Sequence, residues 1–131
     1  MRLIDTHCHL YSEQFDTDRE QVIANAKRMG VDRILLPNVD LQTVAGMHEL
    51  VANHPGVCYP MMGLHPCDVK PDYETEIAQL FSFFDTHTYC AVGEIGIDLY
   101  WDKTTQDIQE KAFLMQVDFA LENGLPIAIH S

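Results

Sequence analysis

The stretch LIDTHCHL, residues 3–10, joins an apolar run to two histidines that stand two positions apart. The run from Arg2 to His7 is typical of a buried β-strand, and no Gly-x-Gly-x-x-Gly turn of a nucleotide-binding fold follows it. Because side chains alternate between the two faces of a strand, His7 and His9 project to the same side. A single histidine is more often a core residue, but two imidazoles at one strand end form a ready chelate for a metal ion.

Four more apolar runs follow this first strand, with helical segments between them. The runs lie at 33–37, 57–62, 89–92 and 126–130, and the apolar helical faces at 17–30, 44–51, 73–84 and 108–119. The pattern Thr17-x-x-Glu20 predicts a capping box at the start of the first helix, which we expect to end at Gly30. Strict alternation of this kind predicts parallel strands, since each helix returns across the sheet and buries its apolar stripe there.

The spacing of these units indicates a particular α/β fold. Eight units of roughly 30 residues make up the length of about 250 residues that is usual for a (β/α)₈ TIM barrel. We therefore predict a TIM barrel, with only its N-terminal five strands and four helices present in this chain. An open five-stranded sheet would leave apolar edges unpaired. The sequence thus predicts that residues 1–131 form the N-terminal half of a single barrel domain whose C-terminal half is absent.

The composition restricts the classes of function. Eight basic and 20 acidic residues give a net charge of −12, which argues against a broad basic face for nucleic acid. The N-terminus lacks the pattern of a secretory signal, and no apolar run reaches the about 18 residues of a membrane span, so we predict a cytoplasmic protein without a membrane partner. The four cysteines form no Cys-x-x-Cys pair and are expected to be reduced packing residues. No obligate protein partner is evident.

Further ligand-type residues follow the later strands. Glu94 lies in AVGEIGID, just past the fourth predicted strand, and His130 ends the fifth. Burying an ionised carboxylate without a partner costs several kcal/mol, so a cation would account for Glu94, although loop amides are an alternative partner. His65 follows the third strand, where it either faces a substrate or stabilises the loop. Because active sites of barrels form at the carboxyl ends of the strands, we predict that these side chains converge with His7 and His9.

The remaining histidines have weaker patterns. His48, His54 and His87 fall within or just after predicted helices, and we predict that all three are surface residues.

Four motifs together resemble a known family. IDTHCHL at 4–10, GLHP at 63–66, GEIGIDL at 93–99 and PIAIHS at 126–131 are similar, in this order, to the successive signatures of the TatD family of metal-dependent deoxyribonucleases. The resemblance covers essentially the whole chain. It implies a TIM-barrel hydrolase that cleaves phosphodiester bonds in DNA with a water activated by two divalent ions, either Mg²⁺, Mn²⁺ or Zn²⁺.

The resemblance also implies roles for individual residues. His7 and His9 would bind one ion, Glu94 would bridge both ions as part of the catalytic machinery, and His130 would bind the second. His65 would act at the substrate phosphate. The family uses a further His after the sixth strand and an Asp after the eighth, and both positions lie beyond the residues of this sequence.

The substrate and the reaction leave alternatives open. Tyr100 and Trp101 follow the Glu94 motif and could stack on a base, and the weak overall attraction to DNA suits a single-stranded or end-bound substrate. A metal amidohydrolase that acts on a cyclic amide or ester is one alternative. Many such enzymes bridge their metals with a carboxylated Lys, whereas this chain has no Lys between Lys70 and Lys103, which favours the phosphodiesterase. A non-catalytic barrel fragment is the other alternative.

Overall fold

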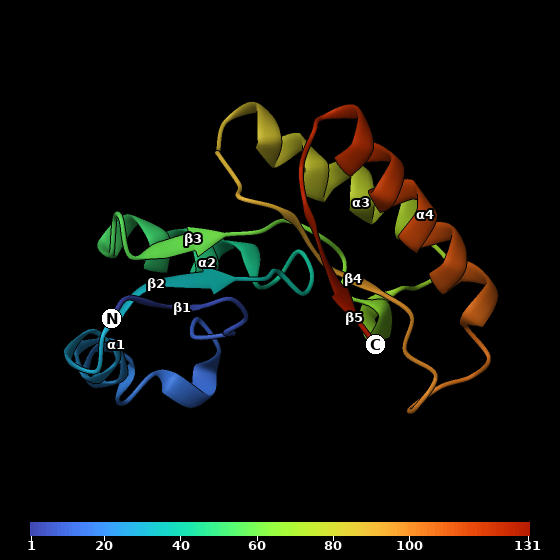
Figure 1. Cartoon of the computed structure of the whole chain (residues 1–131). Helices are drawn as coiled ribbons and strands as arrows, with labels where there is room; N and C mark the ends of the chain where they lie inside the picture. The colour runs from blue at the N-terminus through green and yellow to red at the C-terminus, as the bar shows by residue number, and fades with distance from the viewer.

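Five strands and four α-helices alternate along the chain (Figure 1). The computed structural model describes residues 1–131. The elements are β1 (Leu3–Asp5), α1 (Arg19–Arg28), β2 (Val31–Leu36), α2 (Val44–Asn53), β3 (Cys58–Pro60), α3 (Tyr73–Ser82), β4 (Val92–Gly96), α4 (Gln106–Glu122) and β5 (Ile127–His130). Three short 3-10 helices add η1 (Glu13–Phe15), η2 (Pro66–Asp68) and η3 (Phe83–Asp85). The predicted β-α alternation is therefore confirmed.

The strands are parallel and follow one another in chain order. β1, β2 and β3 form one sheet, and β4 pairs with β5 in a second. A bridge between Met62 and Val92 continues the hydrogen bonding from the chain after β3 to β4, with the amide of Cys90 also donating to the carbonyl of Pro60. All carboxyl ends of the strands therefore point the same way and form one rim, which is the name used for them below.

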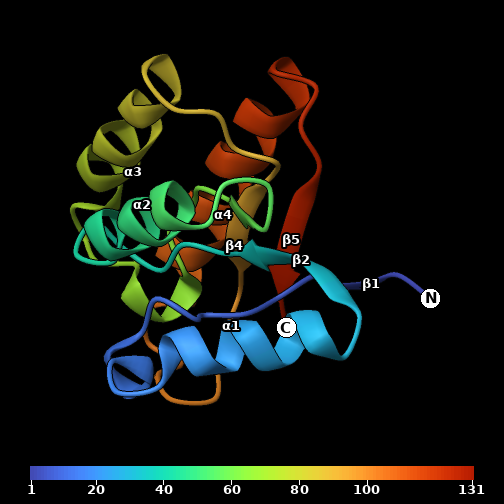
Figure 2. The same cartoon turned by 90° about the vertical axis from the view of Figure 1, so that its left-hand side faces the viewer.

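The helices cover the sheets from outside. α1 packs on β2, α2 on β3 and α4 on β4, while α3 lies against α4 (Figures 1 and 2). The larger core cluster joins the first sheet to α1, α2 and α3 through side chains such as Leu36, Met47 and Leu80. A smaller cluster lies under α4, where the rings of Phe81 and Phe119 are 4.2 Å apart between centroids. This packing covers one face of β2, β3 and β4 and leaves the rim to polar side chains.

Several boundaries differ from the sequence-based expectation; the first strand ends at Asp5, so that His7 and His9 lie in the segment after it. α1 begins at Arg19, and its N-cap Asp18 makes no side-chain cap bond, so the capping box predicted at Thr17 is wrong. The fourth strand lies at Val92–Gly96 and not at 89–92, which places Glu94 inside the strand. The glycines beside Glu94 are the reason, because a Cβ at Gly93 would lie 2.7 Å from the Cβ of Ala128. Gly93 thus allows close pairing with β5 beyond the predicted end of the strand.

The outermost strands expose apolar side chains. Ile4 of β1 is 52% exposed and Ile129 of β5 is 57% exposed. No helix of the chain combines the length and the hydropathy needed to cross a membrane.

Candidate metal centre

A buried carboxylate lies at the centre of the rim. Glu94 is 4% exposed, and each of its two oxygens faces a pair of imidazoles. Oε2 lies 3.1 Å from Nε2 of His7 and 3.2 Å from Nε2 of His9. Oε1 lies 2.7 Å from Nδ1 of His130 and 3.9 Å from Nε2 of His65. The structure thus brings together all five residues, from four strand ends, that the sequence analysis placed at a common rim.

These residues form two groups around one carboxylate. The first group consists of His7, His9 and Glu94, and the second of His65, His130 and Glu94. Within each group, one ligand-type atom of every residue lies within 4.8 Å of the others. Nitrogen and oxygen donors at such spacing suit divalent ions such as Zn²⁺ or Mn²⁺. The donor atoms thus gather at both oxygens of Glu94, each of which offers a candidate position for a cation.

Asn38 ties three strands together beneath this centre. It lies directly after β2, is fully buried, and exchanges backbone hydrogen bonds with β4, accepting from the amide of Glu94 at 3.2 Å and donating to the carbonyl of Gly93 at 3.1 Å. Its side-chain amide donates to the carbonyl of Gly63 at 3.0 Å. Sequence reasoning missed Asn38, and the only signal was a polar residue that closes an apolar run.

Two buried glutamines of α4 hold the loops that follow β3 and β4. Gln116 accepts from the amide of Leu64 at 2.7 Å and donates to its carbonyl at 3.3 Å. Gln109 accepts from the amide of Asp98 at 2.7 Å and donates to its carbonyl at 2.9 Å. The helical periodicity had placed Met115 on the buried face, but Met115 is 39% exposed. The backbone amides and carbonyls of these loops need hydrogen-bond partners, so two glutamines occupy buried positions of α4 where apolar side chains were expected.

In each group, one histidine has a second hydrogen-bond partner, at the ring nitrogen that does not face Glu94, and the sequence analysis did not assign it. The hydroxyl of Tyr11 lies 2.9 Å from Nδ1 of His9 in the first group. In the second group, Oδ2 of Asp98 lies 2.7 Å from Nε2 of His130. Asp98 stands in the GEIGIDL motif, and Tyr11 continues the two-residue spacing of His7 and His9. Both signals were present, but only the folded loops reveal the contacts.

The hydrogen bonds around Glu94 favour its charged form. Burial alone would raise the pKa of Glu94, but the bonds with His9 and His130 and the nearby His7 and His65 outweigh it and bring this pKa to about 2. The bond to His130 and the amide of Tyr100 lower the pKa of Asp98 to about 2. A carboxylate binds a metal ion in its ionised form, so the lowered pKa of Glu94 favours metal binding.

His65 and His130 have opposite electrostatic environments. Burial lowers the pKa of His65, against the attraction of Glu94. Burial also opposes the charge of His130, but its bonds to Asp98 and Glu94 prevail and raise the pKa of His130.

Tyr100 and Trp101 do not approach Glu94. They are 80% and 79% exposed and meet edge to face with ring centroids 4.7 Å apart. They border a hollow that also includes Asp98, His130 and Ser131. The structure therefore places both aromatic rings beside the second group, at the edge of the rim.

The other histidines correct one expectation. The prediction that His48, His54 and His87 all lie at the surface is wrong for the first two. His48 is half-buried and bonds the hydroxyl of Tyr89 at 2.6 Å, because the neighbouring helix turn and the chain before β4 cover it. The side chain of His54 is 13% exposed and contacts Glu20 at 3.0 Å. His87 is exposed and stacks on His48 with ring centroids 4.0 Å apart.

The cysteines are all free, but they do not share one environment. Cys58 is buried, Cys8 and Cys90 are half-buried, and Cys67 is exposed. The expectation that all four are packing residues is therefore wrong for Cys67, which lies in a 3-10 turn at the rim.

Comparison with known proteins identifies similar sequences over nearly the whole chain. The family described as TatD related DNase matches residues 4–131. The chain is 38% identical over 129 residues to the uncharacterized metal-dependent hydrolase YabD of Bacillus subtilis (strain 168), covering 98% of this chain and 50% of that protein. It is 31% identical over 128 residues to the 3'-5' ssDNA/RNA exonuclease TatD of Pectobacterium carotovorum subsp. carotovorum (strain PC1), covering 98% and 49%.

Solved structures extend the comparison to the fold. The crystal structure of YjjV, a TatD homolog from Escherichia coli K12, matches with a TM-score of 0.87 and 30% identity over 99% of this chain and 51% of that chain. An uncharacterized amidohydrolase from Saccharomyces cerevisiae matches with a TM-score of 0.81 over 100% and 48%, and at 16% identity it supports the fold alone. The predicted TIM-barrel class, with five strands and four helices in this chain, is thereby confirmed. The chain spans about half the length of the relatives it matches.

Proposed function

The chain belongs to the TatD family of metal-dependent hydrolases, and from that premise we propose that its rim serves a deoxyribonuclease that hydrolyses phosphodiester bonds. The observation that carries this proposal is the position of Glu94 between two pairs of imidazoles, one pair at each carboxylate oxygen. In the proposal His7 and His9 would hold one divalent ion, His130 would hold a second, and Glu94 would contribute to both. Bound there, such ions would supply Lewis-acid activation of water and of the phosphoryl group.

The hydrogen bonds of His65 support a different role for this residue. Its Nδ1 accepts from the amide of Cys67 at 3.1 Å, so a neutral His65 carries its proton on Nε2. That nitrogen faces Glu94 from 3.9 Å and can donate a hydrogen bond, but it has no lone pair for a cation. We therefore assign His65 to the substrate phosphate, where a donor is needed, and not to the set of metal ligands.

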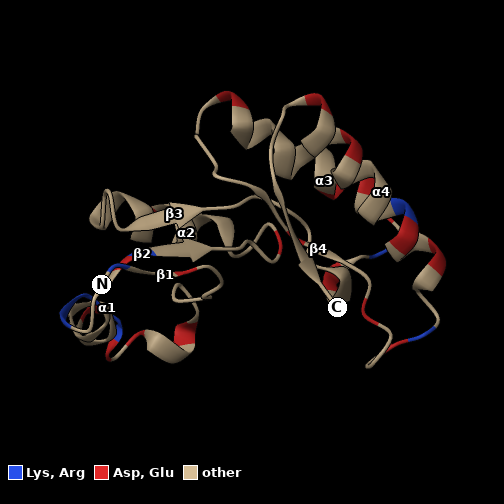
Figure 3. Cartoon of the chain, viewed as in Figure 1, with Lys and Arg blue, Asp and Glu red and all other residues tan.

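The charge distribution favours a substrate that is held locally. Acidic side chains are spread over the helices, while the few Lys and Arg residues are scattered (Figure 3). A chain with a net charge of −12 does not attract a duplex over a broad face. A single strand or a DNA end fits better, with Tyr100 and Trp101 stacking on a base. The name of the Pectobacterium relative, which acts on single-stranded DNA and RNA from the 3' end, supports this choice.

A substrate panel tests the proposed function. We expect the purified protein to release nucleotides from a single-stranded DNA oligonucleotide when Mg²⁺ or Mn²⁺ is added, and to stop when EDTA removes the metal. Glu94→Gln keeps the size of the side chain but loses the charge, and should abolish this release. Glu49→Gln removes an exposed carboxylate of α2 and serves as the matched control. Turnover of a hydantoin or lactone without nucleotide release would instead establish an amidohydrolase.

A further inference from the structure

The hydroxyl group of Tyr11 contacts two different groups at once. It donates to the carbonyl oxygen of Pro37 at 2.5 Å, and it lies 2.9 Å from Nδ1 of His9. A tyrosine hydroxyl has one proton, whereas a carbonyl oxygen can only accept. With its proton engaged by Pro37, the hydroxyl can only accept from His9. The hydrogen bond therefore requires a proton on Nδ1 of His9.

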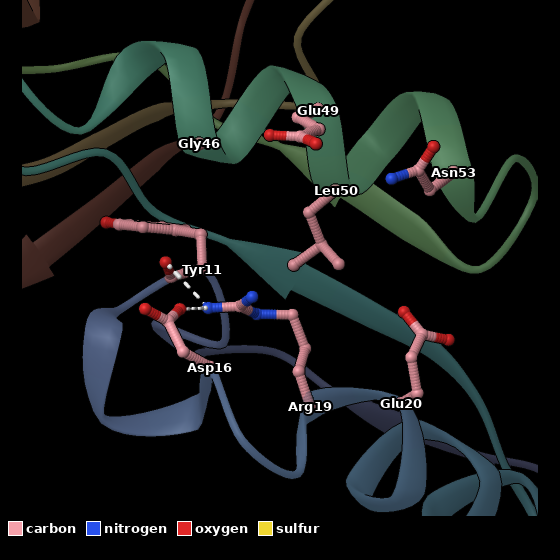
Figure 4. A pocket seen from close by; sticks show the side chains of 8 residues that line it. All are labelled: Tyr11, Asp16, Arg19, Glu20, Gly46, Glu49, Leu50 and Asn53. Carbon is pink, nitrogen blue, oxygen red and sulfur yellow. Dashed lines mark hydrogen bonds and ion pairs between the residues drawn. The ribbon is translucent and has the colours of Figure 1, made fainter.

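The surroundings of Tyr11 keep this arrangement in place. Tyr11 is 9% exposed, and its hydroxyl proton is held by the carbonyl oxygen of Pro37, which can only accept. Arg19 holds the adjoining backbone by donating to the carbonyl oxygens of Leu10 at 2.8 Å and Tyr11 at 3.2 Å. Figure 4 shows Arg19 under this loop, bonded to Tyr11 and Asp16, with the tyrosine ring extending away from it.

The other nitrogen of the same ring faces Glu94. Nε2 of His9 lies 3.2 Å from Oε2 of Glu94. In neutral His9 the proton on Nδ1 leaves a lone pair on Nε2, and this lone pair meets a lone pair of a carboxylate oxygen. Two such acceptors repel each other unless a proton or a cation lies between them. A His9 without a proton on Nε2 therefore leaves a position for a cation between this nitrogen and Oε2 of Glu94.

We propose that Tyr11 is a positioning residue that holds the proton of His9 on Nδ1 and so directs Nε2 toward a cation beside Glu94. The metal part of this inference rests on the proposed function, while the tautomer does not. The two-residue spacing from His9 is the sequence signal for this role, but the contact forms only in the folded loop. Residues that orient a metal-bound imidazole typically change metal affinity by about 10- to 100-fold.

The tautomer is measurable without metal. Long-range ¹H–¹⁵N NMR spectra of the metal-free protein, recorded well above the ordinary histidine pKa of about 6.5, distinguish protonated from unprotonated ring nitrogens. We expect Nδ1 of His9 to be protonated in the wild-type protein, whether or not Nε2 is, and to be partly unprotonated in Tyr11→Phe, where only Glu94 selects the protonated nitrogen. An unprotonated Nδ1 in the wild-type protein would overturn the inference, whatever the metal affinity.

Metal affinity gives the second measurement. Titration with Co²⁺, followed by visible absorption, should show the dissociation constant of the first group increase at least about tenfold in Tyr11→Phe. The matched control is Tyr89→Phe, which removes a similarly buried hydroxyl from His48, away from Glu94, and should leave Co²⁺ binding unchanged. Circular dichroism verifies that both variants fold.

The outcomes separate the two proposals. Co²⁺ binding that is equal in the wild-type protein and in Tyr11→Phe would refute the positioning role and leave the metal-dependent hydrolase intact. Absence of Co²⁺ binding, together with the expected tautomer, would refute the proposed function and retain the role of Tyr11 in holding the Nδ1 proton.

Discussion

The two groups that share Glu94 differ in the second hydrogen-bond partner of one histidine. In the first group, His9 is backed by the neutral hydroxyl of Tyr11. In the second group, His130 is backed by the carboxylate of Asp98 at 2.7 Å. A neutral partner orients an imidazole, whereas an anionic partner also favours positive charge on it. One carboxylate thus joins two positions of unequal electrostatic character.

The largest effect is expected from removing a whole side chain of one group. His7→Ala deletes a nitrogen that lies 3.1 Å from Glu94 and leaves the second group untouched. We expect nuclease activity to fall by orders of magnitude and the metal content, measured by mass spectrometry, to fall from two ions to one per chain. Wild-type activity in this variant would remove His7 from the site.

A smaller effect should follow from neutralising the partner of the second group. Asp98→Asn keeps a similar shape and can still accept a hydrogen bond, but it no longer carries charge. We expect the affinity of the second group for Mn²⁺ to drop by about 10- to 100-fold, with the first group unchanged. Isothermal titration calorimetry resolves the two binding steps. Equal weakening of both steps would show that the groups do not act separately.

The element order and the convergence of the rim histidines could be predicted because both depend on local patterns. Apolar runs with histidines or a glutamate at their ends specify parallel strands whose carboxyl ends meet. The partners Tyr11, Asn38 and Asp98 could not be predicted, because each acts through a contact that exists only after loops from different strands fold together. The end of the fourth strand was placed too early at 92 for a related reason, since the close pairing of Gly93 with β5 is visible only in the fold.

A substitution beside the second group should affect substrate binding only. Trp101→Ala removes an exposed ring that borders the hollow next to His130. We expect KM for single-stranded oligonucleotides to increase several-fold with little change in kcat, since stacking on a base contributes about 1–3 kcal/mol. Steady-state kinetics tests this, and an unchanged KM would exclude stacking on Trp101.

The smallest effect concerns His48 and Tyr89, the same pair of residue types as His9 and Tyr11 but without a carboxylate. Burial, with some repulsion from His87, lowers the pKa of His48. As the pH falls, His48 therefore becomes protonated at a higher pH in the unfolded chain than in the folded protein. The stability due to neutral His48 is complete above a pH of about 6.5 and is lost as the pH falls toward the lowered pKa.

This dependence can be measured by urea unfolding. His48→Gln should flatten the decline in the free energy of unfolding below a pH of about 6.5. An equally steep decline in the variant would assign the effect to other groups.

The central claim is that Glu94 joins two cations, one at each carboxylate oxygen. Anomalous scattering from crystals of the protein grown with Mn²⁺ tests it most directly. We expect two peaks about 3.5 to 4 Å apart, one among His7, His9 and Glu94 and the other beside His130 and Glu94. A single peak, or ions bound away from Glu94, would contradict the claim.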